Sequence, residues 1–585
     1  MTVETLITQH IDTWTSAVKT KSTSGRGSSK KLELYGMKKL RELILELAVR
    51  GKLVPQDPND EPASVLLERI AAEKAQLVKE KKIKKPKLLP PLTSQDLPNL
   101  PQGWEWAYFP DIADYAPGKT PATKNATYWD ETEKGVPWIS IADLNDTGTV
   151  ETSSKKVSEV ACEQVFKKNP VRSGTMLMSF KLTVGKVSIL DVDAYHNEAI
   201  ISIFPYTGIQ QNYLFKVLPS IANSGNKKNA IMGFTLNSES LALLTIPVPP
   251  TIEQHRIVAK VDELMTLCDQ LEQQTEDSIE AHQLLVSTLL NTLTHSADAD
   301  ELMENWARIS DHFDTLFTTE ESIDQLKQTI LQLAVMGKLV PQDPNDEPAS
   351  VLLERIAEEK AQLIKEKKIK KQKALPPIAD DEKPFDLPNG WEWCRFSDMS
   401  NEVATGPFGS MIHKRDYIEG GTPLINPSHM IDSKIIEDNS ITVSDIKVSE
   451  LSSYKLFEND IVMARRGEMG RCALVSKREE GWLCGTGSFV LKFNQSLSRQ
   501  YILLMFRTSY VREYLGGKSI GTTMTNLNHG ILNKMPLLLP PIAQQHRIVT
   551  KVEEMMVLCN QLKARLERSK TTQLHLTDAI VEQAI

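Results

Sequence analysis

KLVPQDPNDEPASVLLERIA stands at Lys52–Ala71, and the same letters stand again at Lys338–Ala357. The likeness extends upstream, where ILELAVRGK (Ile44–Lys52) matches ILQLAVMGK (Ile330–Lys338). Internal self-similarity of this kind is read before any other signal, because it decides the architecture. One long-period pair is not a solenoid of short units, so the repeat predicts two copies of one domain.

A second shared block follows much later in each copy. PPTIEQHRIVAKVDELMTLCDQLE at Pro249–Glu272 parallels PPIAQQHRIVTKVEEMMVLCNQLK at Pro540–Lys563. Between the shared blocks lie two segments, about Ala107–Val248 and Arg395–Leu539, that hardly resemble each other. A duplication without functional meaning would leave these inserts as similar as the blocks around them. The pattern therefore predicts a constant frame that holds two different modules.

The block after each Pro-Pro carries apolar residues in alternating steps of four and three. That spacing is typical of a helix packing along another helix, and an ordinary amphipathic core helix is the alternative. Each helix can run about 40 residues, roughly 60 Å, and this length favours a coiled-coil rod. Two cysteines fall on the seam, where they are expected to be small apolar fillers. The seam positions are Ile257, Val261, Leu264, Cys268 and Leu271 in the first copy and Ile548, Val552, Met555, Cys559 and Leu562 in the second.

The other shared block, Ser64–Lys85 and its copy Ser350–Lys371, is also expected to be helical, with the two serines as N-cap candidates. Its basic tail, KEKKIKK, is interpreted as a solvated helix end or linker. Phosphate contact is the lesser alternative, because charge without geometry gives only sequence-independent affinity. Near the amino terminus, Thr20–Lys31 (TKSTSGRGSSKK) reads as a Gly/Ser linker that the second copy lacks.

Composition bounds the class of protein. A chain of 585 residues is too long for one ordinary domain and suggests two to four. There is no uninterrupted apolar run long enough for a membrane helix, and the start does not resemble a secretory signal. The six cysteines form no C-x-x-C pair, so we expect a cytoplasmic, reduced protein without structural zinc. The net charge of −8 means that any nucleic-acid binding must use local basic surface.

Each insert mixes short apolar runs with Gly, Pro and Asn turns, which is typical of a small α/β module. In the first insert, the expected strands are Val136–Leu144, Gly174–Phe180, Gly185–Leu190 and Glu198–Phe204. In the second, TPLINPSHM, NDIVMARRG, GRCALVS and GSFVLKF fill similar places.

Two stretches partly match catalytic motifs, but neither match is complete. Gly118-Lys119-Thr120 looks like the end of a P-loop, but Ala113 stands where the loop requires glycine. Asn426-Pro427-Ser428-His429 is similar to the N-P-P-aromatic loop of adenine methyltransferases, yet the second proline and the aromatic are missing, and no glycine-rich cofactor loop precedes it. His255 and His546 recur in the frame, where a buried or capping role is favoured over catalysis. Metalloprotease, nuclease and hydrolase motifs are also absent from the sequence, so we find no enzyme site.

The inserts do contain loops rich in hydrogen-bond donors, whose side-chain types reach base edges and phosphates. Each loop taken alone is better explained as a polar surface turn; their occurrence in both inserts of a duplicated frame favours DNA contact. The candidate DNA-binding residues are Lys119, Thr120, Lys124, Asn125, Lys181, Lys227 and Lys228 in the first insert, and Ser410, His413, Lys414, Arg415, Arg465, Arg466, Lys518, Thr522 and Thr523 in the second.

The order of these parts resembles the specificity subunits of type I restriction–modification systems across essentially the whole chain. The Pro-Pro-x-x-[EQ]-Q-x-R-I-V motif, present twice, carries most of the resemblance. Gly118–Leu144 and Thr405–Asn426 are similar to the openings of two target-recognition domain types. T-x-x-N-L-N at Thr523–Asn528 is another family feature, with a weaker match at Thr235–Asn237. The extra amino-terminal portion departs from many family members.

The resemblance implies an α+β fold: two α/β target-recognition domains joined by long antiparallel coiled-coil helices, with a pseudo-twofold internal repeat. It implies double-stranded DNA as a partner, two M (methyltransferase) subunits carrying S-adenosylmethionine, and R (restriction) subunits supplying ATP- and Mg-dependent translocation and cleavage. No cofactor or metal is expected in this chain, and no membrane contact. The implied layout is 1–36 extension and linker, 37–99 helical region, 100–250 first recognition domain, 251–300 long helix, 301–386 central helical region, 387–541 second recognition domain, and 542–585 second long helix.

The sequence thus favours a non-catalytic subunit that reads two unlike half-sites at a separation set by helix length. A coiled-coil scaffold that organises enzyme subunits without reading sequence is the alternative. A self-contained methyltransferase-nuclease is a third possibility, disfavoured by the missing motifs.

Overall fold

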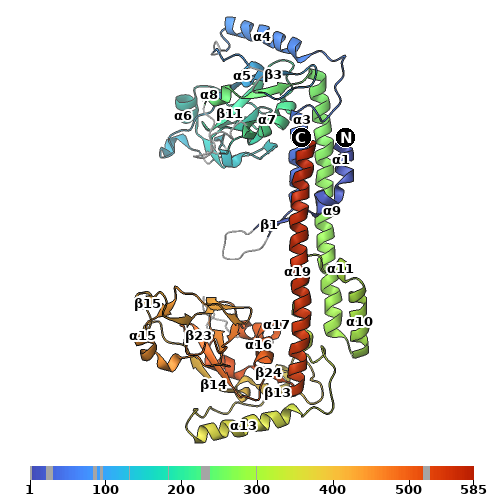
Figure 1. Cartoon of the computed structure of the whole chain (residues 1–585). Helices are drawn as coiled ribbons and strands as arrows, with labels where there is room; N and C mark the ends of the chain where they lie inside the picture. Colours follow the sequence, from blue (N-terminus) through green and yellow to red (C-terminus); the bar gives the residue numbers. More distant parts are fainter. Residues whose placement is uncertain are drawn as a thin grey trace. The chain divides into compact units, whose positions relative to one another are not determined.

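Two compact units make up the chain, as seen in a computed structural model that describes residues 3–21, 31–83, 88–92, 97–130, 132, 134–181, 183–224, 238–297, 299–517 and 527–585. The first unit is Met1–Ser278 with Ser569–Ile585, and the second unit is Ile279–Arg568. The division falls inside two long helices, α9 (Thr251–His295) and α19 (Ile542–Ala584), so each unit contains part of both (Figure 1). These helices have 45 and 43 residues, which confirms the expected length of about 40.

The first unit combines helices with three small sheets and a hairpin. The sheet orders are β10-β5-β7, β4-β11-β8-β9-β6 and β12-β3, and β1 pairs with β2. The helices are α1 (Val3–Gln9), α2 (Ile11–Ser16), α3 (Tyr35–Val49), α4 (Ala63–Lys79), α5 (Phe109–Ile112), α6 (Glu159–Ala161), α7 (Gln211–Ser224) and α8 (Ser238–Ala242). The strands are β1 (Lys19–Lys21), β2 (Lys31–Glu33), β3 (Glu105–Tyr108), β4 (Ala113–Pro117), β5 (Val136–Ile139), β6 (Gly148–Val150), β7 (Lys155–Val157), β8 (Met176–Ser179), β9 (Val187–Leu190), β10 (Tyr195–His196), β11 (Ile200–Pro205) and β12 (Thr245–Val248).

The second unit has the same kind of frame around a different module. Its sheet orders are β13-β24, β14-β23-β20-β21, β15-β19-β16-β22 and β17-β18. The helices are α10 (Ala299–Asp311), α11 (Phe313–Leu316), α12 (Glu320–Val335), α13 (Ala349–Lys365), α14 (Phe396–Met399), α15 (Asp445–Glu450), α16 (Arg499–Arg507), α17 (Ser509–Gly517) and α18 (His529–Lys534). The strands are β13 (Glu392–Arg395), β14 (Ser400–Thr405), β15 (Tyr417–Ile418), β16 (Thr422–Ile425), β17 (Met430–Ile431), β18 (Lys434–Ile435), β19 (Thr442–Val443), β20 (Ile461–Ala464), β21 (Cys472–Leu474), β22 (Leu483–Cys484), β23 (Ser488–Phe493) and β24 (Pro536–Leu539).

Every apolar run predicted as a strand contains one, although most of the predicted runs extend beyond it, and in two of them a one-turn helix follows the strand. Val136–Leu144 is a strand only to Ile139, and the turn η2 (Ile141–Asp143) follows. The run from Thr422 likewise leaves the sheet after Ile425 and enters the turn η6 (Pro427–His429). Both strands end where a polar residue, Ser140 or Asn426, starts a one-turn helix.

The repeated blocks meet at one joint in each unit, where the frame holds its module. In the first unit, the indole Nε1 of Trp104 donates to the Glu253 carboxylate at 3.0 Å, and Arg256 pairs with Asp60 at 2.5 Å. Gln254 accepts from the backbone N–H of Gln210 at 2.8 Å, which ties the start of α9 to the module. At this joint, the residues that the two copies share bind the loop that contains Asp60, the module and the long helix to one another.

The second unit repeats these contacts with one change of side chain. Trp391 Nε1 donates to the Gln544 side chain at 3.0 Å, where the first unit has a carboxylate. Arg547 pairs with Asp346, with Nη1 and Oδ1 3.2 Å apart. Gln545 accepts from the backbone N–H of Ser498 at 3.1 Å. The residues that are the same in both frame copies therefore make the same contacts in both units.

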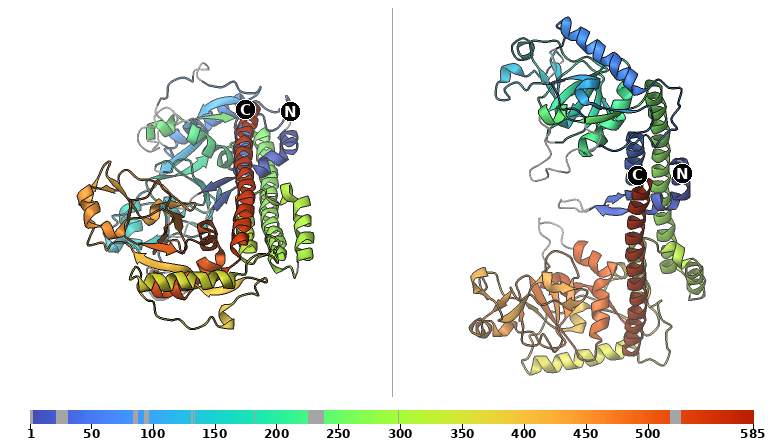
Figure 2. Two further views of the ribbon diagram at one scale, coloured as in Figure 1. Left: turned by 60° about the horizontal axis from the view of Figure 1, so that its bottom comes forward. Right: turned by 45° about the horizontal axis from the view of Figure 1, so that its top comes forward.

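A second repeated contact fixes the shorter frame helices against the modules. Lys74 on α4 donates to the Pro110 carbonyl at 2.8 Å, and Lys360 on α13 donates to the Ser397 carbonyl at 2.6 Å. Figure 2 shows α4 (blue) and α13 (yellow) each lying along one side of its own module. The helices begin at Ala63 and Ala349, so the N-cap prediction for Ser64 and Ser350 was wrong.

The physical reason lies in the backbone of the joint. In the first unit the N–H of Ala63 donates to the Gly103 carbonyl at 2.9 Å, and in the second the N–H of Ala349 donates to Gly390 at 2.8 Å. The loop before the joint tryptophan thus satisfies the first helix donor, and the serine stands inside the first turn. The helices end at Lys79 and Lys365, where each basic tail begins, so the predicted helices to Lys85 and Lys371 were too long. Residues 84 and 85 of the first tail lie outside the described residues.

The seam residues of the long helices are buried or half-buried. Ile257, Val261, Leu264 and Cys268 are buried, as are Ile548, Val552 and Cys559, whereas Leu271, Met555 and Leu562 are half-buried. In the second unit, Ile548, Val552 and Cys559 belong to one apolar core together with Leu290 and Leu293 near the end of α9.

His255 and His546 are a correction, because a buried or capping role was expected. Both side chains are exposed, and both residues lie inside their helices rather than at a cap. The buried face at this point is taken by Glu253 with Gln254 in α9 and by Gln544 with Gln545 in α19. Successive helix residues are about 100° apart, so the histidine after these two residues is turned out of the buried face.

The amino-terminal segment is part of the first unit. Trp14 is fully buried, and a Cβ added at Gly36 would lie 2.2 Å from the Trp14 carbonyl oxygen, so only glycine permits this approach. Glu4 pairs with Lys260 of α9 at 2.6 Å. The predicted linker Thr20–Lys31 was wrong at its ends, because β1 and β2 pair antiparallel there, with Thr20 opposite Leu32. Its residues 22–30 lie outside the described residues.

Within the described residues, every helix falls short of the combined length and apolar character that crossing a bilayer requires.

Candidate nucleic-acid interface

In the first unit, one end of the β4-β11-β8-β9-β6 sheet gathers basic side chains from loops that are distant in sequence. Pro117, the last residue of β4, lies opposite Ile201, and Ser179, the last residue of β8, lies opposite Ile200. The Gly118–Thr120 loop and Lys181 therefore leave the sheet at the same end. Lys186, which precedes β9, stands there too and was missed by the sequence analysis.

The Gly118–Thr120 loop is held firmly by its neighbours. Gly118 packs directly against the His196 backbone, where an added Cβ would meet the His196 carbonyl oxygen at 1.9 Å. The N–H of Lys119 donates to that same carbonyl at 2.9 Å. Burial lowers the pKa of His196 to about 4, so the ring is neutral at physiological pH and supports the loop without adding charge.

Several candidate side chains in this loop are engaged within the protein. Lys119 Nζ donates to the Val165 carbonyl at 3.0 Å, and the Thr120 hydroxyl bonds to Glu198. Asn125 caps the short helix η1 (Ala126–Tyr128) by accepting from the N–H of Thr127 at 3.2 Å. Lys124 is exposed. Of the predicted set in this loop, Lys124 therefore presents the most accessible charge.

In the second unit, the equivalent end of the β14-β23-β20-β21 sheet gathers arginines. Thr405 ends β14 opposite Phe489, and Ala464 ends β20 opposite Ser488. The N–H of Gly406 donates to the Ser488 carbonyl at 2.9 Å, and that of Arg465 donates to Gly487 at 2.9 Å. The Gly406 loop and the Arg465–Arg466 turn were predicted separately. Both bond to the start of β23, so they lie next to each other.

Arg465 is anchored and Arg466 is free to face a ligand. The Arg465 guanidinium lies over the Phe489 ring at 4.8 Å, and its Nε donates to the Leu527 carbonyl at 3.3 Å. Burial, and then the neighbouring charge of Arg466, lower the pKa of Arg465. Arg466 is exposed. A guanidinium held over an aromatic ring beside an exposed one suits phosphate and base contact.

His529 and Phe408 at this edge were not predicted. His529 Nε2 lies 2.7 Å from the Thr405 hydroxyl, and its ring packs 5.2 Å from that of Phe489. Burial, and then the charge of Arg465, lower the pKa of His529. Phe408, two residues past Gly406, is 69% exposed. Phe408 lies within the Thr405–Asn426 stretch and His529 directly follows the T-x-x-N-L-N motif. Only the strand register places Thr405, the partner of His529, beside Arg465.

Two further arginines surround a single carboxylate at the same place. Arg471, directly before β21, pairs with Glu468 at 2.7 Å, and Arg512 of α17 approaches the other oxygen of Glu468 at 3.5 Å. One acid thus balances only part of the local positive charge. The edge is a candidate anion-binding surface although the whole chain carries a net charge of −8.

The remaining candidates fall into two groups. Ser410, His413, Lys414 and Arg415 are exposed in the segment that follows Gly406. Lys227, Lys228, Lys518, Thr522 and Thr523 lie outside the described residues. Leu527 directly follows residues 518–526, which lie outside the described residues. The N–H of Leu527 donates to the Arg465 carbonyl at 3.0 Å, and Asn528 caps α18. The last two letters of T-x-x-N-L-N thus position His529 beside Arg465.

Comparison with known proteins supplies the family. The model of the type I restriction modification DNA specificity domain matches residues 101–281 and 388–568. The type I restriction enzyme EcoAI specificity subunit of Escherichia coli is 42% identical over 608 residues, covering 100% of both chains. The EcoEI specificity subunit of Escherichia coli is 43% identical over 609 residues, also covering 100% of both. A crystal structure of the HsdS subunit from Thermoanaerobacter tengcongensis matches 84% of this chain and 99% of its own at 16% identity, with a TM-score of 0.39. With two matches of the domain model and full-length relatives above 40% identity, the chain belongs to the DNA-specificity family of type I restriction–modification systems.

Proposed function

We propose that this DNA-specificity subunit reads a two-part, asymmetric DNA site, with the sheet end of each unit contacting one half-site. The observation that carries the proposal is the contrast between the units. Equivalent frame contacts hold two modules whose sheet ends carry different side chains, Lys124, Lys181 and Lys186 in one and Arg465 and Arg466 in the other. One frame with two chemically different surfaces suits two unlike base sequences.

The chain acts without chemistry of its own in this proposal. Its partners are double-stranded DNA, two M subunits and R subunits, and S-adenosylmethionine, ATP and Mg belong to those partners. The target adenine leaves the base stack for a pocket of an M subunit. The failed P-loop at Gly118 and the incomplete Asn426–His429 motif support this assignment.

A module exchange tests the readout. The cut points should lie at Gly103 and Pro250, because β3 and β12 pair and must move together, with Val248 opposite Glu105. Trp104 travels with the module, but a relative with the same GWEW letters restores its bond to Glu253. The complex with M subunits is then used to methylate DNA, and the modified sites are sequenced. We expect a new first half-site with an unchanged second one.

The reciprocal exchange between Gly390 and Pro541 is the matched control and should change the other half-site alone. An unchanged motif after both exchanges would overturn the proposal. The competing function, a scaffold without sequence readout, predicts equal affinity for the specific duplex and a random one at physiological salt. The wild-type complex distinguishes the two functions before any variant is made.

The long helices are proposed to set the gap between the half-sites, because spacing in DNA-binding proteins follows protein geometry, at about 34 Å per turn of DNA. To test this, one helical turn is inserted between Glu272 and His282 of α9. This position avoids the joint at Glu253–Arg256. It also avoids the contact of His282 with the Thr315 carbonyl at 3.1 Å. The expected result is an altered gap with both half-sites retained. A changed half-site would contradict this role.

A further inference from the structure

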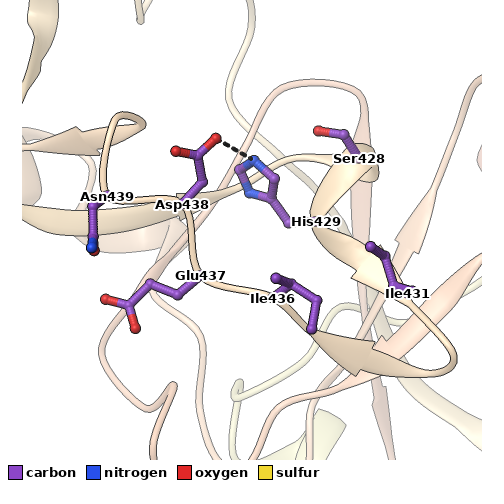
Figure 3. A pocket seen from close by; sticks show the side chains of 7 residues that line it. All are labelled: Ser428, His429, Ile431, Ile436, Glu437, Asp438 and Asn439. Atoms are coloured by element: carbon purple, nitrogen blue, oxygen red, sulfur yellow. Dashed lines mark ion pairs between the residues drawn. The ribbon is translucent and has the colours of Figure 1, made fainter.

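A pocket of about 390 Å³ opens in the second unit beside the turn η6, in the stretch whose motif led to no enzyme (Figure 3). Its polar lining is Ser428, His429, Glu437, Asp438 and Asn439, and two isoleucines complete it. Figure 3 shows the His429 ring and the Asp438 carboxylate facing each other across it.

His429 presents a donor without a hydrogen-bond partner. The residue is 6% exposed, and its Nδ1 accepts from the N–H of Asn426 at 3.3 Å. Burial lowers the pKa of His429 against the opposing effects of the Asp438 charge and the Leu424 backbone, so the ring is neutral. Because Nδ1 accepts from Asn426, the ring proton is assigned to Nε2. Among the described residues, Nε2 has no hydrogen-bond partner; the Asp438 carboxylate is 3.8 Å away. A buried donor left in this way points to an absent ligand.

Asp438 supplies the matching acceptor. Its Oδ1 accepts from the Ser440 hydroxyl at 2.6 Å and from the Ser440 N–H at 2.9 Å. These bonds lower the pKa of Asp438 and keep it ionised. Oδ2 is the oxygen that faces His429, and the side chain is 41% exposed. The neighbouring Glu437 is paired with Arg478, which leaves Asp438 as the carboxylate available in the pocket.

The pocket adjoins the arginine-bearing end of the sheet. The Pro427 carbonyl, two residues before His429 in η6, accepts from Arg471 Nη1 at 3.4 Å. The N–H of Gly485 donates to the Ile425 carbonyl at 2.9 Å, so the end of β16 is fixed beside the residues that lead into β23. Arg471 thus links this turn to the arginine-bearing end of the sheet.

We propose that His429 and Asp438 read an adenine in the half-site recognised by the second unit, with His429 Nε2–H donating to N7 and Asp438 Oδ2 accepting from the N6 amino group. This inference rests on the proposed function. In the major groove adenine alone presents an acceptor and a donor side by side on one base. Guanine would place its O6 acceptor against the carboxylate, and the pyrimidines lack N7. The contact with Asp438 at 3.8 Å is too long to satisfy the Nε2 donor of the neutral ring.

The test uses the full subunit in complex with M subunits, and it begins with the wild-type motif. His429→Ala and Asp438→Ala should each relax one adenine position of the second half-site by about 10- to 100-fold, while the first half-site keeps its discrimination. A duplex with 7-deazaadenine at that position should weaken wild-type binding and leave His429→Ala unaffected. His429→Gln, which keeps an N–H donor, should recover part of the discrimination. Glu437→Gln is the matched control in the same pocket and should leave the motif unchanged.

The outcomes separate this inference from the function on which it rests. If the wild-type complex methylates no defined motif, the proposed function fails. If the motif is defined but all variants retain it while binding DNA normally, the pair is structural only and the inference fails. If the relaxed position proves to be cytosine, Asp438 reads an N4 amino group and the adenine assignment is overturned.

Discussion

The indole of Trp104 donates a hydrogen bond to Glu253 at 3.0 Å, and these two residues join the module of the first unit to its long helix. Glu253 is only 1% exposed. Burial raises its pKa, because hydrogen bonds from Gln56 and Trp104 and the charge of Arg256 offset only part of the desolvation. The second unit has Gln544 at this point, a neutral side chain that accepts the same indole bond. The two units thus have an acid and an amide at equivalent positions, each accepting a hydrogen bond from a tryptophan indole.

Glu253→Gln should change how stability depends on pH. A folded pKa above the unfolded value means that the wild-type contribution is complete below the unfolded pKa and declines as pH rises through the folded one. The amide has no proton to lose. The melting temperature of the variant relative to wild type should therefore rise from acidic to neutral pH. The matched change Gln544→Glu should show the opposite trend, and parallel profiles for wild type and both variants would contradict the explanation.

Asp60→Asn should destabilise the first unit by about 1–3 kcal/mol, the range for hydrogen bonds to charged groups. Asp60 is 6% exposed on its side chain and pairs with Arg256, so the substitution leaves a half-buried guanidinium without its counter-charge. Urea unfolding followed by circular dichroism measures the loss. Asp346→Asn, at the equivalent contact with Arg547, should cost a similar amount. Exposed Asp57→Asn in the same loop is the control, and an equal effect there would remove any special role for the pair.

Glu272→Lys should weaken the contact between α3 and α9, because Arg41 pairs there with Asp269 at 2.7 Å and with Glu272. These ion pairs are partly exposed, so the expected loss is about 0.5–1 kcal/mol. The second unit has the reverse order, with Lys563 of α19 next to Asp324 of α12 at 3.5 Å. Adding Lys38→Asp, which copies Asp324, should therefore restore stability. A double-mutant cycle in chemical denaturation measures the coupling, and strict additivity would show that the charge order is irrelevant.

Arg466→Ala should lower affinity for specific and random duplexes alike. Each phosphate contact that is lost reduces the slope of log K against log salt by about 0.9. Fluorescence anisotropy at several salt concentrations, with M subunits present, gives that slope. Lys551→Ala, an exposed cation on α19 that pairs with Glu554, should leave it unchanged. A loss confined to the specific duplex would instead make Arg466 a base-reading residue.

Local patterns were sufficient for the frame and for the strands of the modules. The period of Ile257, Val261 and Leu264 predicted a helix of the observed length because helical packing depends on spacing along one chain. Predictions from local patterns were wrong where a residue distant in the sequence determines the contact. Ser64 has cap chemistry, yet the Gly103 carbonyl satisfies the first helix donor, and His255 turns away from a face already filled by Glu253.

The duplication in the sequence was enough to determine that this protein is one frame used twice around two different modules, because identical letters must form identical local contacts. Tertiary structure alone decided which side chains can meet a ligand. Lys119 and Thr120 look like DNA contacts in the sequence, but folding directs them to the Val165 carbonyl and to Glu198. Arg465, His529 and Phe408 come from separate loops and meet at one edge only through strand register. Pairing between strands is a non-local hydrogen-bond pattern, and no short stretch of sequence contains it.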